Sequence, residues 1–256
     1  MTIDGKVILI TGASQGIGAA CAREFRNRGA RLSLTARSED KLKEVAGADA
    51  VVTAGDITSA VVRSRVVERT MERFGAIDIL VNNAGAGLYA PAWKAPLDEA
   101  HSLFELNFFA PLAMVQLVAP HMREQRSGMI VNIGSIAGKV TLPWFTLYSA
   151  TKYALGSLTE GLRMELAGDG IHAMVVCPGY VTTDFQAHAL VGRPPDRLWR
   201  VAITAEQCAR AVARGVERDA RTVVTPAIGW AFIAMQRLFP ALLEMQLSRI
   251  YRGLAQ

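Results

Sequence analysis

A tyrosine and a lysine four residues apart, Tyr148 and Lys152, form the pair in this sequence best suited to proton transfer. In a helix, residues four apart lie on the same face. Bringing the pKa of a tyrosine from about 10 toward about 7 takes about 4 kcal/mol. A lysine cation about 4 Å away supplies on the order of 4 kcal/mol at a dielectric near 20. We therefore predict that Lys152 lowers the pKa of Tyr148, so that the phenol exchanges a proton with a substrate oxygen. Such pairs also arise by chance on surface helices, so a catalytic role for this pair depends on the motifs around it.

The segments that would position this pair alternate between short β-branched runs and longer helical patterns. The predicted strands are residues 6–11, 31–36, 50–53, 77–82, 128–134, 171–177 and 221–224. The predicted helices are residues 16–28, 38–46, 59–74, 97–126 with a break near 109–111, 147–167 and 205–218. This order predicts an α/β fold, a single Rossmann-like doubly wound seven-stranded parallel sheet with helices on both faces. We expect residues 1–225 to form a dinucleotide-binding and catalytic domain, and residues 226–256 to be its C-terminal amphipathic helical extension.

Composition excludes several classes of protein. The chain has 256 residues, of which 51% are apolar and 20% charged, enough for a sizeable core. Its three cysteines are widely spaced and its four histidines lack ligand spacing, so we expect neither disulfides nor a metal site. The net charge of +5 is scattered among acids, which predicts solvated faces and no nucleic-acid partner. The first residues lack the layout of a signal peptide, and we expect a cytoplasmic location.

A glycine-rich turn, residues 11–18, joins the first predicted strand to the first predicted helix. Its glycines permit a tight turn, close approach of a pyrophosphate and close packing of helix on strand. The turn is not of the GxxxxGK[ST] type, so nucleoside-triphosphate hydrolysis is not expected. The cofactor contacts predicted here are Gly12, Ser14, Gln15, Gly16, Ile17 and Gly18.

The end of the second predicted strand bears on the choice of cofactor. Arg37 and Ser38 stand where a carboxylate would otherwise bind the ribose hydroxyls of NAD(H). An arginine fork matches a 2′-phosphate, so we predict NADP(H); alternatively, Arg37 is a surface charge flanking a helix. Asp56 and Ile57 follow the third strand and are expected beside the adenine, although Asp56 could equally cap the helix starting near Ser59.

Polar and glycine motifs also follow the later strands. They are Asn82-Asn83-Ala84-Gly85 after the fourth strand, Ser135 after the fifth, and Pro178 to Thr183 after the sixth. Asn107 lies in an apolar helical pattern, where its amide must either bond a broken helix backbone or hold a water. With the glycine turn and the Tyr148/Lys152 pair, these motifs resemble the short-chain dehydrogenase/reductase family in its compact single-domain form, over roughly residues 5–225.

The resemblance implies a role for each matching residue. Tyr148 would be the general acid/base, Lys152 would lower its pKa and bind the nicotinamide ribose, Ser135 would orient the substrate oxygen, and Asn107 would hold a relay water. The resemblance adds Tyr148, Lys152, Asn83, Ala84, Gly85, Pro178, Gly179, Val181 and Thr183 to the cofactor contacts. It also implies a homodimer or homotetramer. Two positions depart from the pattern: Gln15 stands where NADP-preferring members often carry a basic residue, and Gly134 replaces a common serine.

The expected reaction interconverts a carbonyl and a secondary alcohol, with hydride from the nicotinamide and a proton from Tyr148. Mostly apolar residues are expected around the substrate: Leu88, Tyr89, Trp93, Leu142, Trp144, Phe145, Phe185, Leu190 and Trp199. They favour a small hydrophobic carbonyl or alcohol. Arg193, Arg197 and Arg200 could attract an acidic tail, although solvated charges explain them equally. The alternatives are a catalytically idle NADPH-binding sensor or scaffold and, among enzymes, a 3-oxoacyl thioester reductase.

The C-terminal segment allows two interpretations. Residues 222–236 carry no charge, and an amphipathic pattern with Leu243, Leu247, Ile250 and Leu254 follows. The charge-free run is short for a membrane span and contains Pro226. The segment either packs at an oligomer interface or over the substrate mouth, or lies in a membrane interface as a peripheral contact.

Overall fold

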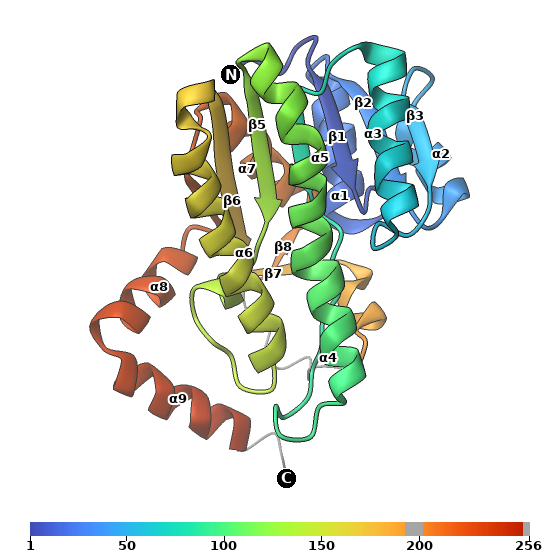
Figure 1. Ribbon diagram of the computed structural model, residues 1–256. Helices are drawn as coiled ribbons and strands as arrows, with labels where there is room; N and C mark the ends of the chain where they lie inside the picture. Colours follow the sequence, from blue (N-terminus) through green and yellow to red (C-terminus); the bar gives the residue numbers. More distant parts are fainter. Residues whose placement is uncertain (193–201, 253–256) are drawn as a thin grey trace.

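A parallel sheet runs through the centre of the computed structural model, which describes residues 1–192 and 202–252 (Figure 1). Its strand order is β3-β2-β1-β4-β5-β6-β9. The strands are β1 Val7–Thr11, β2 Arg31–Ala36, β3 Val51–Ala54, β4 Ile79–Asn82, β5 Gly128–Ile133, β6 Ile171–Pro178 and β9 Thr222–Thr225. The central strands β1, β4 and β5 are buried along their whole length, as parallel strands covered on both faces are. The predicted seven-stranded, doubly wound α/β fold is confirmed.

Helices cover both faces of this sheet. They are α1 Gly16–Asn27, α2 Glu39–Ala46, α3 Ala60–Phe74, α4 Leu97–Phe104, α5 Ala110–Gln125, α6 Thr146–Glu165, α7 Ala205–Glu217, α8 Gly229–Leu238 and α9 Pro240–Arg252. Apolar side chains of α1, α2 and α7 pack on one face, and those of α3, α5 and α6 pack on the other. Because the crossovers place helices on both faces, the carboxyl ends of the strands meet at one edge, where a ligand can bind.

The predicted break near residues 109–111 is wrong. The helix is continuous from Leu97 to Gln125. A π-helical turn, Glu105–Phe109, joins α4 to α5, and the N–H of Ala110 donates to the carbonyl of Glu105. Pro111 has no N–H to give to the carbonyl four residues before it, and a π-helical turn accommodates the missing donor without ending the helix. This helix is long and apolar enough to cross a membrane, but a core helix passes the same test, and it packs on the sheet here.

A small parallel sheet near the end of β6 was not predicted. β7, Tyr180–Thr182, pairs in parallel with β8, Ala202–Thr204, so that Tyr180 lies opposite Ala202 and Thr182 opposite Thr204. Strands of three residues are too short to show a period of two in the sequence. The pair holds the chain that follows β6 against the start of α7, whose capping box begins at Thr204.

The C-terminal helices α8 and α9 extend beyond the carboxyl ends of the strands (Figure 1). Ile233 and Leu243 pack on Val140, and the rings of Tyr251 and Trp144 lie 6.3 Å apart. One face of this extension therefore covers residues 136–145, which agrees with the interpretation that it packs over the substrate mouth.

Candidate functional site

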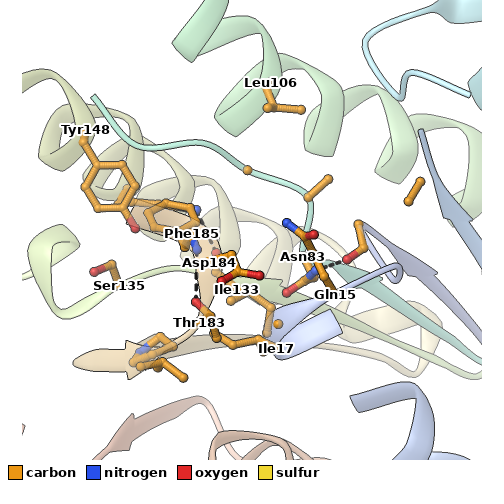
Figure 2. A pocket seen from close by; sticks show the side chains of 18 of the residues that line it. Gln15, Ile17, Asn83, Leu106, Ile133, Ser135, Tyr148, Thr183, Asp184 and Phe185 are labelled. Carbon is orange, nitrogen blue, oxygen red and sulfur yellow. Dashed lines mark hydrogen bonds between the residues drawn. The ribbon is translucent and has the colours of Figure 1, made fainter. Parts of the chain in front are cut away.

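A cavity of about 1040 Å³ opens at the carboxyl edge of the sheet (Figure 2). It is lined by the turn after β1, by the chain after β2 to β6, and by α6. The predicted site residues that line it are Gly12, Ser14, Gln15, Gly16, Ile17, Arg37, Ser38, Asp56, Ile57, Asn83, Ala84, Gly85, Ser135, Tyr148, Lys152, Pro178, Gly179, Val181 and Thr183. Two predicted site residues, Gly18 and Asn107, lie behind the lining. Motifs that are far apart in the sequence thus line one cavity in the structure.

The glycine turn is pressed against the end of β4. Gly12 has φ +65°, and a Cβ there would lie 2.8 Å from the Cα of Ala84. A Cβ on Gly18 would meet the carbonyl of Gly12, so Gly18 packs beneath the turn and does not face the cavity. The amide of Asn83 donates to the carbonyls of Thr11 and Gly12, at 2.9 and 3.0 Å. In return, the Thr11 hydroxyl accepts from the main-chain N–H groups of Asn83 and Ala84.

Cationic side chains gather where the cavity reaches the end of β2. Arg37 and Ser38 line it as predicted, and Lys41, which was not predicted, joins them from α2. The ammonium of Lys41 donates to the side-chain oxygen of Gln15 at 3.3 Å. Lys41 therefore places a second cation, besides Arg37, next to Gln15, which stands where the family pattern often has a basic residue. Its place four residues after Arg37, on the following helix, was the signal that could have identified it.

Asp56 lines the same end of the cavity and also organises its own turn. Its carboxylate accepts from both the N–H and the hydroxyl of Thr58, each at 2.9 Å. The turn leads into α3 by way of Ser59, whose N–H donates to the Asp56 carbonyl. Asp56 therefore closes the turn before α3 but does not cap that helix, whose N-cap is Ser59 with no side-chain cap bond, and the adenine contact stays a prediction.

Tyr148 and Lys152 occupy the same face of α6 and are both buried. The Tyr148 hydroxyl points toward Ser135, which stands at the end of β5 (Figure 2). Ser135 is itself fixed, since its hydroxyl accepts from the N–H of Ala137 at 3.1 Å. The Lys152 ammonium donates to the carbonyl of Ile133 at 2.9 Å and lies 5.7 Å from the centre of the Tyr148 ring.

The predicted effect of Lys152 on Tyr148 is not found in this structure. Burial raises the pKa of Tyr148 to about 12, and a hydrogen bond with Ser135 opposes the rise only in part. Burial also lowers the pKa of Lys152 to about 8. The ammonium lies over the ring and is held by Ile133, while the rings of Phe145 and Phe185 lie 6.1 and 5.9 Å from that of Tyr148 and contribute to its burial. Desolvation therefore outweighs the neighbouring charge, and at neutral pH the phenol keeps its proton and can donate it.

Asn107 lies in the π-helical turn and is fully buried. Its amide oxygen accepts from the N–H of Ala86 at 2.9 Å, and its amide nitrogen donates to the Ala86 carbonyl and to the Thr151 hydroxyl. Thr151 in turn donates to the main-chain carbonyl of Tyr148 at 2.7 Å. The side chain thus bonds a loop backbone, not the helix backbone expected as one alternative, and joins that loop to α6.

Apolar side chains surround the part of the cavity near Tyr148. Of the predicted substrate residues, Leu142, Phe145, Phe185 and Leu190 line it, together with Leu106, Ile136 and Ala137, which were not predicted. Leu88, Tyr89 and Trp144 pack behind them, while Trp93 is exposed and takes no part. Trp199, Arg193, Arg197 and Arg200 lie outside the described residues.

Hydrogen bonds between main chains hold the loops around this apolar end together. The N–H of Tyr89 donates to the carbonyl of Val191 at 2.9 Å, and that of Leu190 donates to Gly87 at 2.8 Å. On the other side, the N–H of Ala90 donates to the carbonyl of Trp144 at 2.9 Å. The loop after β4 therefore lies between the two segments that carry most of the apolar lining.

Known proteins are similar to this chain in sequence and in fold. Residues 6–192 match the family model described as short chain dehydrogenase. The ketoacyl reductase HetN of Nostoc sp. is 32% identical, with 98% of this chain and 90% of the relative covered. A short chain dehydrogenase from Burkholderia cenocepacia in complex with NADP superimposes with a TM-score of 0.84 at 29% identity, covering 96% of this chain and 99% of the other. A relative from Burkholderia phymatum in complex with NAD gives 0.85 at 25% identity, covering 95% and 96%.

Proposed function

The chain belongs to the short-chain dehydrogenase/reductase family, and from this premise we propose that it is an NADP(H)-dependent oxidoreductase interconverting a carbonyl and a secondary alcohol on a small hydrophobic substrate. One observation carries the proposal. A glycine turn suited to a pyrophosphate and the side chains of Ser135, Tyr148 and Lys152 line the same cavity. The family membership makes the chain an oxidoreductase, and the residues around the cavity support the proposed cofactor preference, residue roles and substrate class.

The cavity residues fit a nicotinamide dinucleotide. Gly12 lets the turn lie close to the end of β4, and Gly16 leaves space opposite Thr183, to which a Cβ on Gly16 would come within 3.4 Å. When bound, the cofactor supplies the hydride. Asn83 would hold the glycine turn in shape, and Pro178, Gly179, Val181 and Thr183 would border the nicotinamide.

The chain's own residues would manage the proton. Tyr148 carries its proton at neutral pH, as a free phenol does, and burial raises its pKa further; it donates this hydroxyl proton to the carbonyl oxygen of the substrate. Ser135, toward which that hydroxyl points, orients the same oxygen. Lys152 binds the nicotinamide ribose with its buried ammonium. The side chain of Asn107 is engaged by protein groups, so a relay water would be held by its main-chain carbonyl, whose regular helical donor would be Pro111.

The preference for NADP(H) rests on the cations at the end of β2. Arg37 and Lys41 line the cavity beside Ser38, and a guanidinium fork matches a phosphate. Similar structures hold NAD in one case and NADP in another, so the fold alone does not decide the preference. We expect Arg37→Asp to raise the KM for NADPH at least about tenfold and to change the KM for NADH much less. Arg65→Asp, on an exposed part of α3, is the matched control; equal effects of Arg37→Asp on both cofactors would remove the support for NADP(H).

The substrate class is tested with a panel of ketones and alcohols. The apolar lining favours hydrophobic members, and the panel includes fatty β-keto thioesters, because a relative is named a ketoacyl reductase, together with steroids and sugars. Consumption of NADPH is followed by its absorbance. A protein that binds NADPH tightly but turns over no member of the panel would favour the idle sensor or scaffold. We further propose a cytoplasmic homodimer or homotetramer, as in the family, which light scattering would measure.

A further inference from the structure

The outer face of the C-terminal hairpin, residues 229–252, exposes large apolar side chains. Its inner face is used, because Ile233, Leu243 and Tyr251 are buried against residues 136–145. The exposed members of the outer face are Trp230, Phe232, Leu238, Phe239, Leu242, Met245 and Ile250, with Leu238 69% and Phe239 61% exposed. Single exposed apolar residues are ordinary, but a group of this size on two consecutive helices indicates a binding surface.

The apolar residues are concentrated where the two helices meet. Leu238, Phe239 and Leu242 are neighbours in the sequence, and Met245 lies one turn further along α9. Leu242 and Met245 are three apart on α9 and so share a face of that helix, and Phe239, the residue that links α8 to α9, is exposed beside them; these three residues form the stripe. In Figure 1 this junction is among the parts of the fold furthest from the sheet.

The charges around this stripe are predominantly basic. Residues 226–256 contain three arginines and one acid, Glu244, a net charge of +2. Arg237 precedes the stripe and Arg249 follows it, and both are exposed. A twofold contact with a second copy would place this positive segment against itself. An anionic surface, by contrast, would be attracted by the arginines while the stripe enters an apolar layer.

We propose that the outer face of the C-terminal hairpin binds the surface of an anionic lipid bilayer. Phe239, Leu242 and Met245 enter the boundary between headgroups and acyl chains, and Arg237 and Arg249 contact the lipid phosphates. Trp230, on the preceding helix, has the amphipathic ring that suits this interface. The hairpin's inner face covers the segment that lines the cavity with Ile136, Leu142 and Phe145. Docking would therefore bring the apolar end of the cavity close to the bilayer, but the docking itself does not depend on the proposed reaction.

The test is co-sedimentation of the full chain with vesicles of phosphatidylcholine, with or without phosphatidylserine. We expect sedimentation with the phosphatidylserine vesicles and little with phosphatidylcholine alone. Phe239→Glu and Leu242→Glu should each weaken binding by roughly tenfold or more, since each removes an apolar side chain from the layer and adds a repelled charge. Arg237→Gln and Arg249→Gln should each weaken binding by roughly fivefold.

Controls separate the hairpin from other exposed residues. Met164→Glu changes an apolar side chain on α6 that is 76% exposed, and Arg65→Gln changes an exposed arginine on α3. Both should sediment like the unmodified chain, and all variants should keep its melting temperature. Failure of the unmodified chain to sediment would overturn the proposal, as would equal binding to both kinds of vesicle. The unmodified chain could instead form an oligomer that does not bind vesicles, and light scattering could show that the hairpin variants no longer form it. In that case a second copy covers this face and the proposal is wrong.

Discussion

Replacing Asn107 by alanine tests the network that joins the loop after β4 to α6. The buried amide makes three hydrogen bonds, to the N–H and carbonyl of Ala86 and to the hydroxyl of Thr151. Each buried main-chain group left without a partner costs about 1–3 kcal/mol. Two such groups at Ala86, with the small cavity left by the side chain, give an expected loss of about 3–5 kcal/mol in the free energy of unfolding. That is a large part of the roughly 5–15 kcal/mol by which proteins are stable.

The assay is urea unfolding followed by circular dichroism, with Asn27→Ala as the matched control. Asn27 is exposed at the end of α1, so the same substitution there should change stability by less than about 0.5 kcal/mol. Because Thr151 also donates to the carbonyl of Tyr148, we expect the Asn107→Ala variant to lose turnover as well. A loss of stability below about 1 kcal/mol for Asn107→Ala would show that the hydrogen bonds described here do not hold this loop in place.

Two further predictions concern the buried lysine and the glycine turn. Folding lowers the pKa of Lys152 from 10.5 to about 8. Between these two pH values the lysine is protonated in the unfolded chain and neutral in the folded chain. The free energy of unfolding should therefore rise with pH over this range, by about 3 kcal/mol in all. The urea midpoint of the wild type should therefore rise from pH 8 to 10 relative to that of Lys152→Met; parallel midpoints would contradict the lowered pKa. Gly12→Ala should weaken NADPH binding and lower the melting temperature, since its Cβ would lie 2.8 Å from the Cα of Ala84 at φ +65°. Gly168→Ala is the control, because nothing lies within 4 Å of a Cβ at that position. NADPH binding is titrated by fluorescence, and equal affinities of the two variants would contradict the predicted close contact at Gly12.

The sequence predicts the sheet well because its central strands are apolar on both faces. Strands such as β4 and β5 read as continuous apolar runs, and their polar ends mark the edge where the cavity lies. The small β7–β8 sheet escapes prediction because its strands have three residues and are separated by a long connection. The π-helical turn escapes it because Pro111 suggests a helix break, while the packing of α5 on the sheet keeps the helix continuous.

The sequence identifies most of the residues that line the cavity but not the electrostatics around them. A spacing of four residues places Tyr148 and Lys152 on one face, yet it does not reveal that Ile133 holds the ammonium or that aromatic rings pack around the phenol. The pKa of Tyr148 depends on those tertiary contacts, which explains why its shift has the opposite sign to the prediction. Thr11 was missed for the same reason, since it acts through Asn83, a partner distant in the sequence, whereas Lys41 had a local signal in its spacing from Arg37.

The turnover of Tyr148→Phe, measured beside that of Tyr153→Phe, tests most directly whether the phenol of Tyr148 supplies the proton. Tyr153 lies on the same helix, is 41% exposed and does not line the cavity, so its hydroxyl should be dispensable. With NADPH and the best carbonyl substrate of the panel, Tyr148→Phe should bind the cofactor as the wild type does but lose at least about 100-fold in kcat, because the proton donor is removed. Tyr153→Phe should keep full activity. Wild-type turnover in Tyr148→Phe would contradict the assignment of the proton to this phenol.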